Sequence, residues 1–235
     1  MLSAVPQTHR PDNLQTTAMS EVAYERLRQA ILNNLLPPGA KIVENEIAGS
    51  LGMSRTPIRE ALSRLMREGL VEAVGLRGVR VSLVRSNELQ NIYDVLAALE
   101  SQAAALLAKR PLKERRPAIA AMQAALTGME NALASNDLLL WSDLDGRFHY
   151  ALFEGCGNSR LARMASTEID LGRQSRILTL HRRKNLEQSN VEHSAILRAV
   201  RSGVPEEARQ AMLVHRERTT NIIVPLVREL EKGVI

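Results

Sequence analysis

The spacing of apolar residues changes once along this chain, and that change constrains the fold more than any other feature of the sequence. Before residue 70 the apolar residues recur at helical spacing, and prolines or glycines divide the pattern into three segments. The expected helices cover residues 20–35, 44–51 and 54–68. Two strand-like runs follow on either side of the turn residues Gly75 and Gly78, and they predict a β-hairpin over 70–83. Three short helices and a hairpin together predict a winged helix-turn-helix.

After Arg85 the helical spacing returns and continues to the end of the chain. The expected helices cover residues 86–108, 113–134, 137–154, 159–180, 186–202 and 205–232. Six helices in about 150 residues predict an antiparallel bundle of six or seven helices. The expected fold class is therefore mainly α. Its expected parts are a flexible tail (1–19), a winged helix-turn-helix domain (20–85) and an all-helical domain (86–235).

Composition favours a cytoplasmic protein without a membrane partner. No apolar run approaches the roughly 18 residues that a membrane-spanning helix needs. The polar N-terminus, which holds two prolines, lacks the apolar region of a secretory signal. Cys156 is the one cysteine in the sequence, which excludes an internal disulfide and a cysteine zinc cluster and fits a reducing compartment.

The positive charge of the chain is concentrated in one short stretch. The whole sequence has a formal net charge of +5. Residues 53–85 alone hold seven arginines against three glutamates. Such a local basic patch indicates a polyanionic partner, with nucleic acid as the first candidate. The alternative is a solvated helix face that is rich in arginine.

The start of the third expected helix carries the residues suited to reading DNA. A recognition helix presents its N-terminal turn to base edges in the major groove. Arg55 and Arg59 are four residues apart and project from one face of that turn. An arginine can bond to guanine O6 and N7 or clamp a phosphate. Ser54 and Thr56 add hydroxyls and N-terminal amides for phosphate oxygens.

Other arginines of the basic stretch have weaker claims to a DNA contact. Arg77 lies at the tip of the expected hairpin between two glycines, where a wing would reach a phosphate or the minor groove. Arg64 and Arg67 lie further along the third helix. For these two we expect ion pairs with neighbouring glutamates, namely Glu60, Glu68 and Glu72.

Three stretches of this region carry a family resemblance. They read Leu35-x-Pro-Pro-Gly, then Glu44-x-x-Ile-Ala-x-x-Leu-Gly-Met-Ser-Arg-Thr-Pro-Ile-Arg-Glu-Ala-Leu-x-Arg-Leu, then Glu68-Gly-Leu-Val. Over about residues 20–85 the sequence resembles the GntR family of bacterial transcription regulators. The resemblance implies a homodimer that reads a short palindromic operator in double-stranded DNA. It also implies that Arg55, Thr56 and Arg59 contact DNA, with Arg77 and Gly78 in the wing.

Three of the five histidines lie on apolar stripes of different expected helices, and they are His149, His193 and His215. A single inward histidine is most often a core residue with satisfied hydrogen bonds. Three on separate helices also suit a shared metal ion. Asp145 precedes His149 by one helical turn, so both side chains can reach the same point. One aspartate and three imidazoles suit zinc, nickel or a manganese-type divalent ion.

A second resemblance covers about residues 86–230. It is carried by Asp145-Gly-Arg-Phe-His149, Gly157-Asn158, Glu192-His193-Ser-Ala-Ile-Leu and His215. These stretches look like the FCD ligand-binding domain of the FadR subfamily. The resemblance implies that Asp145 and the three histidines hold a divalent metal, with zinc or nickel preferred. That metal would lie at the floor of a pocket for a small-molecule effector.

One position departs from that subfamily. Many members carry an arginine near the position of Leu96, where this sequence has leucine. If that arginine anchors the carboxylate of an effector, another residue must replace it here. Arg173 and Arg176 on a neighbouring helix are candidates. The alternative is that both are solvated surface charges.

These observations favour a transcription regulator, expected to be a repressor, whose operator affinity changes when a small carboxylate binds at the metal. Two alternatives remain. The first is a metal-dependent helical hydrolase that uses Asp145 and the histidines, although this leaves the stretch Ser54–Leu62 unexplained. The second is a regulator in which the metal only stabilises the bundle.

Overall fold

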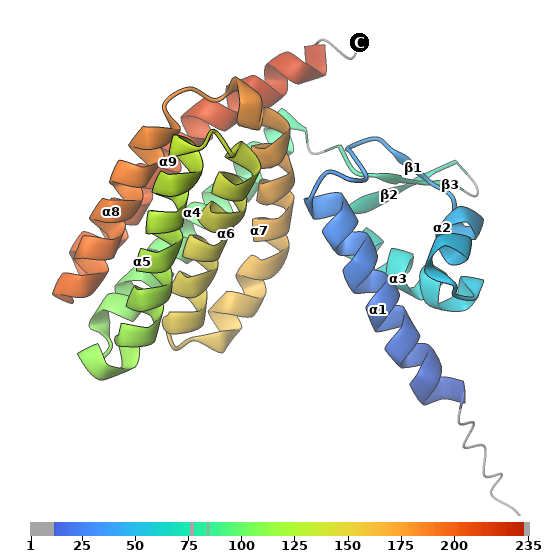
Figure 1. The fold of residues 1–235 in the computed structure, drawn as a ribbon, viewed down its shortest axis with the longest axis horizontal. Coiled ribbons are helices and arrows are strands. Elements are labelled where there is room, and N and C mark those ends of the chain that lie inside the picture. The colour runs from blue at the N-terminus through green and yellow to red at the C-terminus, as the bar shows by residue number, and fades with distance from the viewer. Residues whose placement is uncertain (1–11, 76–77, 84, 233–235) are drawn as a thin grey trace, which may run out of the picture. The chain divides into compact units, whose positions relative to one another are not determined.

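In the computed structural model of this chain, residues 12–75, 78–83 and 85–232 are described. The chain divides into two compact units, and the division falls directly after Leu83. The first unit combines helices with a small sheet, whereas the second is entirely helical (Figure 1).

The N-terminal unit contains three helices, and the first two pack against the third. They are α1 (Asp12–Leu32), α2 (Glu44–Leu51) and α3 (Arg55–Arg67). Ile58, Leu62 and Leu65 of α3 are buried, because apolar residues at this spacing share one helix face, and α1 packs against them. Gly52 follows α2 with a φ of 63°, a left-handed conformation that glycine adopts without steric cost. The other face of α3 is open to solvent.

Helix α1 corrects the predicted extent of the N-terminal tail. It begins at Asp12, whereas the sequence predicted a tail up to residue 19. Residues 1–11 of that predicted tail lie outside the described residues. The physical reason is that no proline or glycine follows Pro11 until Pro37, so the helix extends beyond the stripe of buried residues on which the prediction depended.

The sheet of this unit has three strands, of which the sequence predicted two. The strands are β1 (Lys41–Ile42), β2 (Val71–Val74) and β3 (Gly78–Val81), in the order β1-β3-β2 with antiparallel pairing throughout. The predicted hairpin is β2 and β3, with Val71 opposite Val81 and Val74 opposite Gly78. Strand β1 was missed because two residues are too short to show a period of two.

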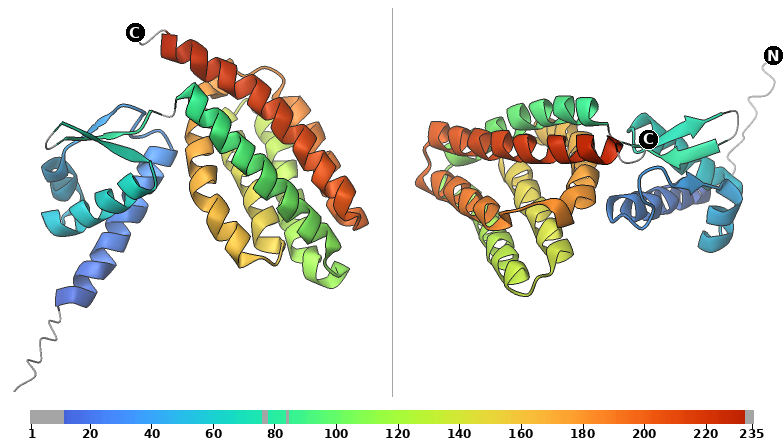
Figure 2. Two further views of the ribbon diagram at one scale, coloured as in Figure 1. Left: turned by 180° about the vertical axis from the view of Figure 1, so that it is seen from behind. Right: turned by 90° about the horizontal axis from the view of Figure 1, so that it is seen from above.

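The C-terminal unit is the predicted helical bundle, and its described part contains six α-helices. They are α4 (Ser86–Lys109), α5 (Leu112–Ala134), α6 (Leu138–Gly155), α7 (Ser159–Thr179), α8 (Leu186–Ser202) and α9 (Pro205–Lys232), with a 3-10 turn η1 (Leu180–Arg182) after α7. Helix α4 packs most extensively against α9, and α5 against α6 (Figure 2). Within the described residues, every helix is too short or too rich in charged side chains to pass through a lipid bilayer.

The interior of the bundle holds a large apolar core and also buried charged side chains, which come from α4, α6, α7, α8 and α9. Trp141 and Phe148 are fully buried, and the Trp141 indole N–H donates to Asn190 Oδ1 at 3.0 Å. The same interior also buries aspartate, glutamate, arginine and histidine side chains. Because a buried charge is costly unless it is paired, these polar side chains are the candidates for a functional site in the bundle.

Candidate nucleic-acid interface and metal centre

The N-terminal turn of α3 presents its predicted DNA-reading residues to solvent. Ser54 stands at the N-cap with extended backbone and no side-chain capping bond, and Thr56 is exposed. The side chains of Arg55 and Arg59 are 63% and 68% exposed. The core contacts of α3 therefore leave these two arginine side chains on the solvent-facing side of the helix.

Glu44, which sequence reasoning did not assign to the site, lies between the two arginines. Its Oε2 is 3.3 Å from Arg55 Nη2 and 3.8 Å from Arg59 Nε. The three residues come from α2 and α3, and Glu44 is 28% exposed. The Glu44 carboxylate thus holds both guanidinium groups on one side of α3 in the absence of DNA. The one signal in the sequence was that Glu44 opens the stretch that carries the family resemblance.

A groove separates this surface from the wing. It has a volume of about 660 Å³, and its lining includes Glu44, Arg55, Arg59, Gly75 and Gly78. A Cβ placed on Gly78 would stand 2.6 Å from the carbonyl oxygen of Val74, so the tight hairpin needs glycine here. The predicted contact Arg77 lies outside the described residues.

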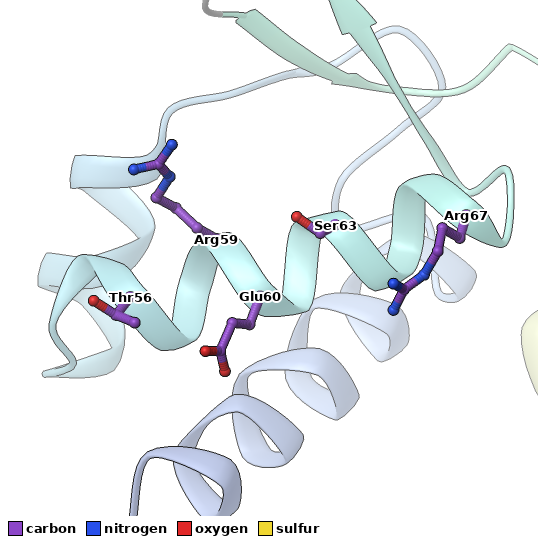
Figure 3. A pocket seen from close by; sticks show the side chains of 5 residues that line it. All are labelled: Thr56, Arg59, Glu60, Ser63 and Arg67. Carbon is purple, nitrogen blue, oxygen red and sulfur yellow. The ribbon is translucent and has the colours of Figure 1, made fainter. Parts of the chain in front are cut away.

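The remaining arginines of α3 differ from one another. Arg64 forms the expected ion pair with Glu68 at 3.3 Å, adds Glu21 at 2.8 Å, and stacks over the Tyr24 ring. Arg67 was expected to be paired as well, but it makes no ion pair with any residue that the structure describes. A second groove of about 400 Å³ runs along the open face of α3 (Figure 3), and it is lined by Thr56, Arg59, Glu60, Ser63 and Arg67.

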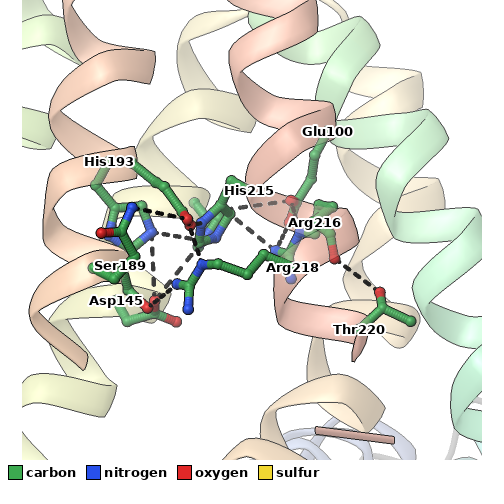
Figure 4. Close-up of polar contacts among 11 residues, drawn as sticks. Glu100, Asp145, Ser189, His193, His215, Arg216, Arg218 and Thr220 are labelled. Carbon is green, nitrogen blue, oxygen red and sulfur yellow. Dashed lines mark hydrogen bonds and ion pairs between the residues drawn. The ribbon is translucent and has the colours of Figure 1, made fainter. Parts of the chain in front are cut away.

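In the bundle, the structure brings the three predicted histidines together. His149 on α6, His193 on α8 and His215 on α9 are buried, and one nitrogen from each lies within 4.8 Å of the others. Nε2 of His149 is 3.3 Å from Nε2 of His193. Figure 4 shows His193 and His215 converging from their two helices toward Asp145. Helices distant in sequence therefore place three imidazoles around one point.

Asp145 lies at the edge of this cluster. Its Oδ1 is 3.5 Å from His193 Nε2 and 3.9 Å from His149 Nε2. Its other oxygen faces Arg176, with 3.5 Å between Oδ2 and Nε. Asp145 is not part of the set of atoms that all lie within 4.8 Å of one another, which comprises only the three histidines among the described residues. The carboxylate is nevertheless directed toward two of them.

Two glutamates that the sequence did not single out as site residues contact the Nδ1 atoms of His215 and His149. Glu192 Oε2 lies 2.9 Å from His215 Nδ1, and Glu100 Oε2 lies 3.4 Å from His149 Nδ1. Glu100 is itself bound by Arg216 through two nitrogens. Partners at Nδ1 thus orient the rings of His149 and His215, which is how histidine ligands of metals are commonly supported, whereas Nδ1 of His193 has no partner among the described residues.

The electrostatics of the cluster favour the metal-binding forms of its side chains. Burial lowers the pKa of His193 and His215 well below the ordinary value, so both rings are neutral near pH 7. Burial alone would raise the pKa of Asp145, but the charges of His149, Arg176 and Arg183 outweigh it and hold that pKa below its usual range. Neutral imidazoles and an ionised carboxylate are the forms that bind divalent metals.

The donor set fits a divalent metal. Two ring nitrogens bound at about 2.0–2.1 Å by a tetrahedral zinc ion stand about 3.3 Å apart. The Nε2 atoms of His149 and His193 have this separation. Imidazole nitrogens with one carboxylate oxygen are ligands that zinc and nickel accept.

The two candidate effector-binding arginines lie in different surroundings. Arg176 on α7 is buried, and beside it a Cβ built on Gly172 would meet Arg176 Nη1 and Leu96 Cδ1 at 3.3 Å each. The alternative of a solvated surface charge is therefore wrong for Arg176, whose guanidinium and the Leu96 side chain both border Gly172. Arg173 is one-fifth exposed and pairs with Asp143 at 3.3 Å.

Comparison with known families agrees with both halves of this description. Residues 19–81 match the model of bacterial regulatory proteins of the gntR family, and residues 91–218 match the FCD domain. The chain belongs to the GntR family, with an FCD domain. The combination is that of a DNA-binding head joined to a helical domain, as the resemblance in the sequence implied.

Relatives of this GntR-family chain are transcriptional regulators. An uncharacterized HTH-type transcriptional regulator of Agrobacterium vitis is 36% identical over 64% of this chain and 91% of its own length. The HTH-type transcriptional repressor GlaR of Escherichia coli is 28% identical over 92% of this chain and 99% of its own. The solved structure of E. coli McbR/YncC shares the fold, with a TM-score of 0.76 and 20% identity over 90% of this chain and 98% of that one.

These comparisons decide between the classes of function considered above. The relatives named here are transcriptional regulators, and GlaR among them is a repressor. The exposed turn of α3 is accounted for as part of a DNA-binding domain. The protein is a transcriptional regulator rather than an enzyme.

Proposed function

We propose that this regulator binds a palindromic operator as a homodimer and that a small organic acid, bound at a divalent metal in the bundle, changes its operator affinity. The DNA-binding domain is residues 20–85, and residues 86–235 form the domain for effector binding and dimerisation. Ser54, Arg55, Thr56 and Arg59 meet the DNA, together with Arg77 and Gly78 of the wing. GlaR being a transcriptional repressor supports repression as the mode of action.

The convergence of three buried imidazoles from α6, α8 and α9 is the observation that carries the metal-dependent part. Three histidines packed against one another without a shared ion would have to satisfy their inward nitrogens among themselves. His149, His193 and His215, with Asp145 beside them, would hold zinc or nickel. When bound, the ion supplies a Lewis-acid centre for a carboxylate oxygen.

The residues of this chain keep the site ready for that ion. Glu192 and Glu100 orient two of the imidazoles through their Nδ1 atoms. Arg176 lies beside Asp145 and supplies a positive charge next to the metal-binding atoms. An acid bound there would be held by the positive charges of the metal ion and of Arg176. Its binding would favour one of two arrangements of the bundle, and these arrangements differ in operator affinity. Coupling of this kind is typically about 1–3 kcal/mol, or about 5–150-fold in affinity.

A DNA titration tests the regulatory part of this proposal. Purified protein is titrated against the DNA upstream of its own coding sequence and against random DNA of equal length, at moderate salt. We expect the upstream DNA to be retained selectively and the variant Arg55→Ala with Arg59→Ala to lose this selectivity while keeping its fold. Equal retention of both DNAs by the unmodified protein would contradict the proposal.

Metal analysis with thermal melting tests the effector part. We expect about one divalent ion per chain, a lower melting temperature after chelation, and recovery when zinc or nickel is restored. The variant His193→Ala should lose the ion. The distance of 3.3 Å between Nε2 of His149 and Nε2 of His193 also suits a hydrogen bond between the two rings. If the purified protein binds no metal, that hydrogen bond explains the distance and the metal part of the proposal is wrong. A metal that raises stability while no organic acid shifts the melting temperature would indicate a purely structural ion.

A further inference from the structure

Several buried polar atoms near the histidines have no hydrogen-bond partner among the described residues. They are Tyr93 Oη, Thr219 Oγ1, Nε and Nη1 of Arg176, and Nη1 of Arg183. A buried donor without a partner costs about 1–3 kcal/mol. One such atom can be served by an ordered water, but a group that includes two guanidinium groups indicates a ligand with negative charge.

These atoms belong to one region of the bundle. A Cβ built on Gly172 would lie 3.2 Å from the Tyr93 ring and 3.3 Å from Arg176 Nη1. Arg176 Nε lies 3.5 Å from Asp145. Arg183 Cζ lies 5.2 Å from the centre of the Trp141 ring, and Trp141 precedes Asp145 by one turn of α6, which places Arg183 near this carboxylate. Thr219 follows His215 by one turn of α9, so both are on the same face of that helix.

The charges of this region do not balance. Arg216 is neutralised by Glu100, and Arg218 by Glu192. Within the part of the chain that the structure describes, Asp145 is the carboxylate that interacts with Arg176 and Arg183. Two guanidinium groups and one carboxylate leave one positive charge, and a divalent ion bound beside Asp145 raises the excess to three. Because a buried charge is costly unless it is paired, a ligand with one negative charge leaves two of these three uncompensated.

We infer that the ligand of this site is a small dicarboxylate that carries a hydroxyl group. This inference rests on the proposed function and names the class of its effector. One carboxylate binds at the metal and the other meets Arg176 and Arg183. The hydroxyl oxygens of Tyr93 and Thr219 can donate to or accept from the hydroxyl of the ligand. Arg176 and Arg183 thereby take the place of the arginine that is absent at Leu96.

Calorimetric titration of the zinc-loaded protein tests the preference. The probes are matched acids: malate against lactate, which lacks the second carboxylate, and malate against succinate, which lacks the hydroxyl. Longer hydroxy dicarboxylates, tartrate and citramalate, extend the series. We expect at least one hydroxy dicarboxylate to bind about tenfold or more tighter than lactate, since hydrogen bonds to charged groups are worth about 1.5–3 kcal/mol.

The variant Arg183→Gln assigns the preference to a residue. It should lower affinity for the dicarboxylate by about tenfold and leave affinity for lactate nearly unchanged. Arg182→Gln is the matched control, because Arg182 is the exposed neighbour in the same turn. Arg183→Lys keeps the charge and should retain part of the preference, which covers the case that Arg183→Gln fails to fold.

The outcomes separate this inference from the proposed function. Monocarboxylates that bind as tightly as dicarboxylates, with Arg183→Gln reducing both alike, would overturn the inference and leave the proposed function standing. If no acid of the series binds the zinc-loaded protein, both the inference and the effector part of the proposed function are wrong. Loss of the metal itself would show as an absent zinc signal before any acid is added.

Discussion

The arginines of the two units lie at similar distances from carboxylates, but they differ in how far they are exposed to solvent. Arg55 stands 3.3 Å from Glu44 on an open helix face, with its side chain 63% exposed. Arg176 stands 3.5 Å from Asp145 with its side chain 4% exposed. Two unit charges 4 Å apart interact by about 1 kcal/mol in water and about 4 kcal/mol at an effective dielectric constant near 20. The same pairing is therefore exchangeable in one unit and fixed in the other.

This difference matches the partners proposed for the two units. DNA must displace Glu44 from the arginines of α3, and a weak, exposed pair permits that exchange at small cost. The buried arginines cannot lose a partner without leaving a charge in a medium of low dielectric constant. Under the proposed function, the unbalanced charge of the buried arginines selects the ligand, whereas the surface arginines of α3 select among DNA sequences.

The largest expected effect is on the fixed side of the comparison. Arg216→Met removes the partner of Glu100, which is fully buried. We expect the free energy of unfolding of the bundle to fall by about 3–5 kcal/mol, because an uncompensated carboxylate remains inside. Urea unfolding followed by tryptophan fluorescence measures this, since Trp141 is the single tryptophan of the chain and lies in the bundle core.

A double variant provides the check on that result. Arg216→Met with Glu100→Leu removes both charges and should recover most of the lost stability. Arg209 lies on the same helix, is partly exposed, and bonds the exposed Glu206 and Gln102 of α4, so Arg209→Met should change stability by less than about 1 kcal/mol. A loss for Arg216→Met no larger than that for Arg209→Met would show that burial does not fix these pairs.

For the exposed arginines of α3, a substitution should change DNA binding much more than it changes the free energy of unfolding. Arg55→Ala should weaken operator binding by about 5–150-fold, which corresponds to about 1–3 kcal/mol for an arginine that reads a base. Its effect on the free energy of unfolding should stay within about 0.5 kcal/mol. Arg67→Ala should weaken operator and random DNA equally, if Arg67 contacts only phosphate. Quantitative gel-shift titrations on both DNAs separate these two patterns, and an equal loss on both DNAs for Arg55→Ala would contradict base reading.

The support of the histidines offers a third comparison. Glu192→Gln should lower the affinity for zinc by about 10–100-fold, because Glu192 orients His215 through Nδ1. Competition with a chromogenic zinc chelator measures this affinity. Glu187→Gln, an exposed change on the same helix, is the matched control. Equal zinc affinities for the two variants would place Glu192 outside the metal site.

The sequence predicted the elements well where a local pattern was long. The starts of α8 and α9 and both strands of the hairpin follow from apolar spacing and from the residues that interrupt it, which are the polar run 182–185 before α8, Gly203 and Pro205 before α9, and the glycines of the hairpin. The histidines could be identified as inward-facing for the same reason. Their convergence could not be derived from spacing, because His149 and His193 are 44 residues apart and their approach depends on how α6 and α8 pack.

The spacing of residues along the sequence could not predict ion pairs between side chains of distant elements. Glu100 meets Arg216 across 116 residues, and neither belongs to a recognisable motif. Glu44 meets Arg55 across 11 residues because α2 and α3 turn about Gly52, so the pairing depends on the turn. In each case a charged residue to which the sequence assigned no partner proves to be half of a pair.

Glu44 itself gives the smallest expected effect and the sharpest test of exchangeability. The carboxylate orients Arg55 and Arg59 and also repels phosphates, so Glu44→Gln should act in two directions. We expect affinity for random DNA to rise by about twofold to fivefold, the size of an exposed ion pair, while the ratio of operator to random affinity falls. Glu46→Gln removes the same charge from an exposed position in the same helical turn and serves as the matched control. If both variants raise binding to random DNA and neither changes the ratio, Glu44 acts through its charge alone and does not position the arginines.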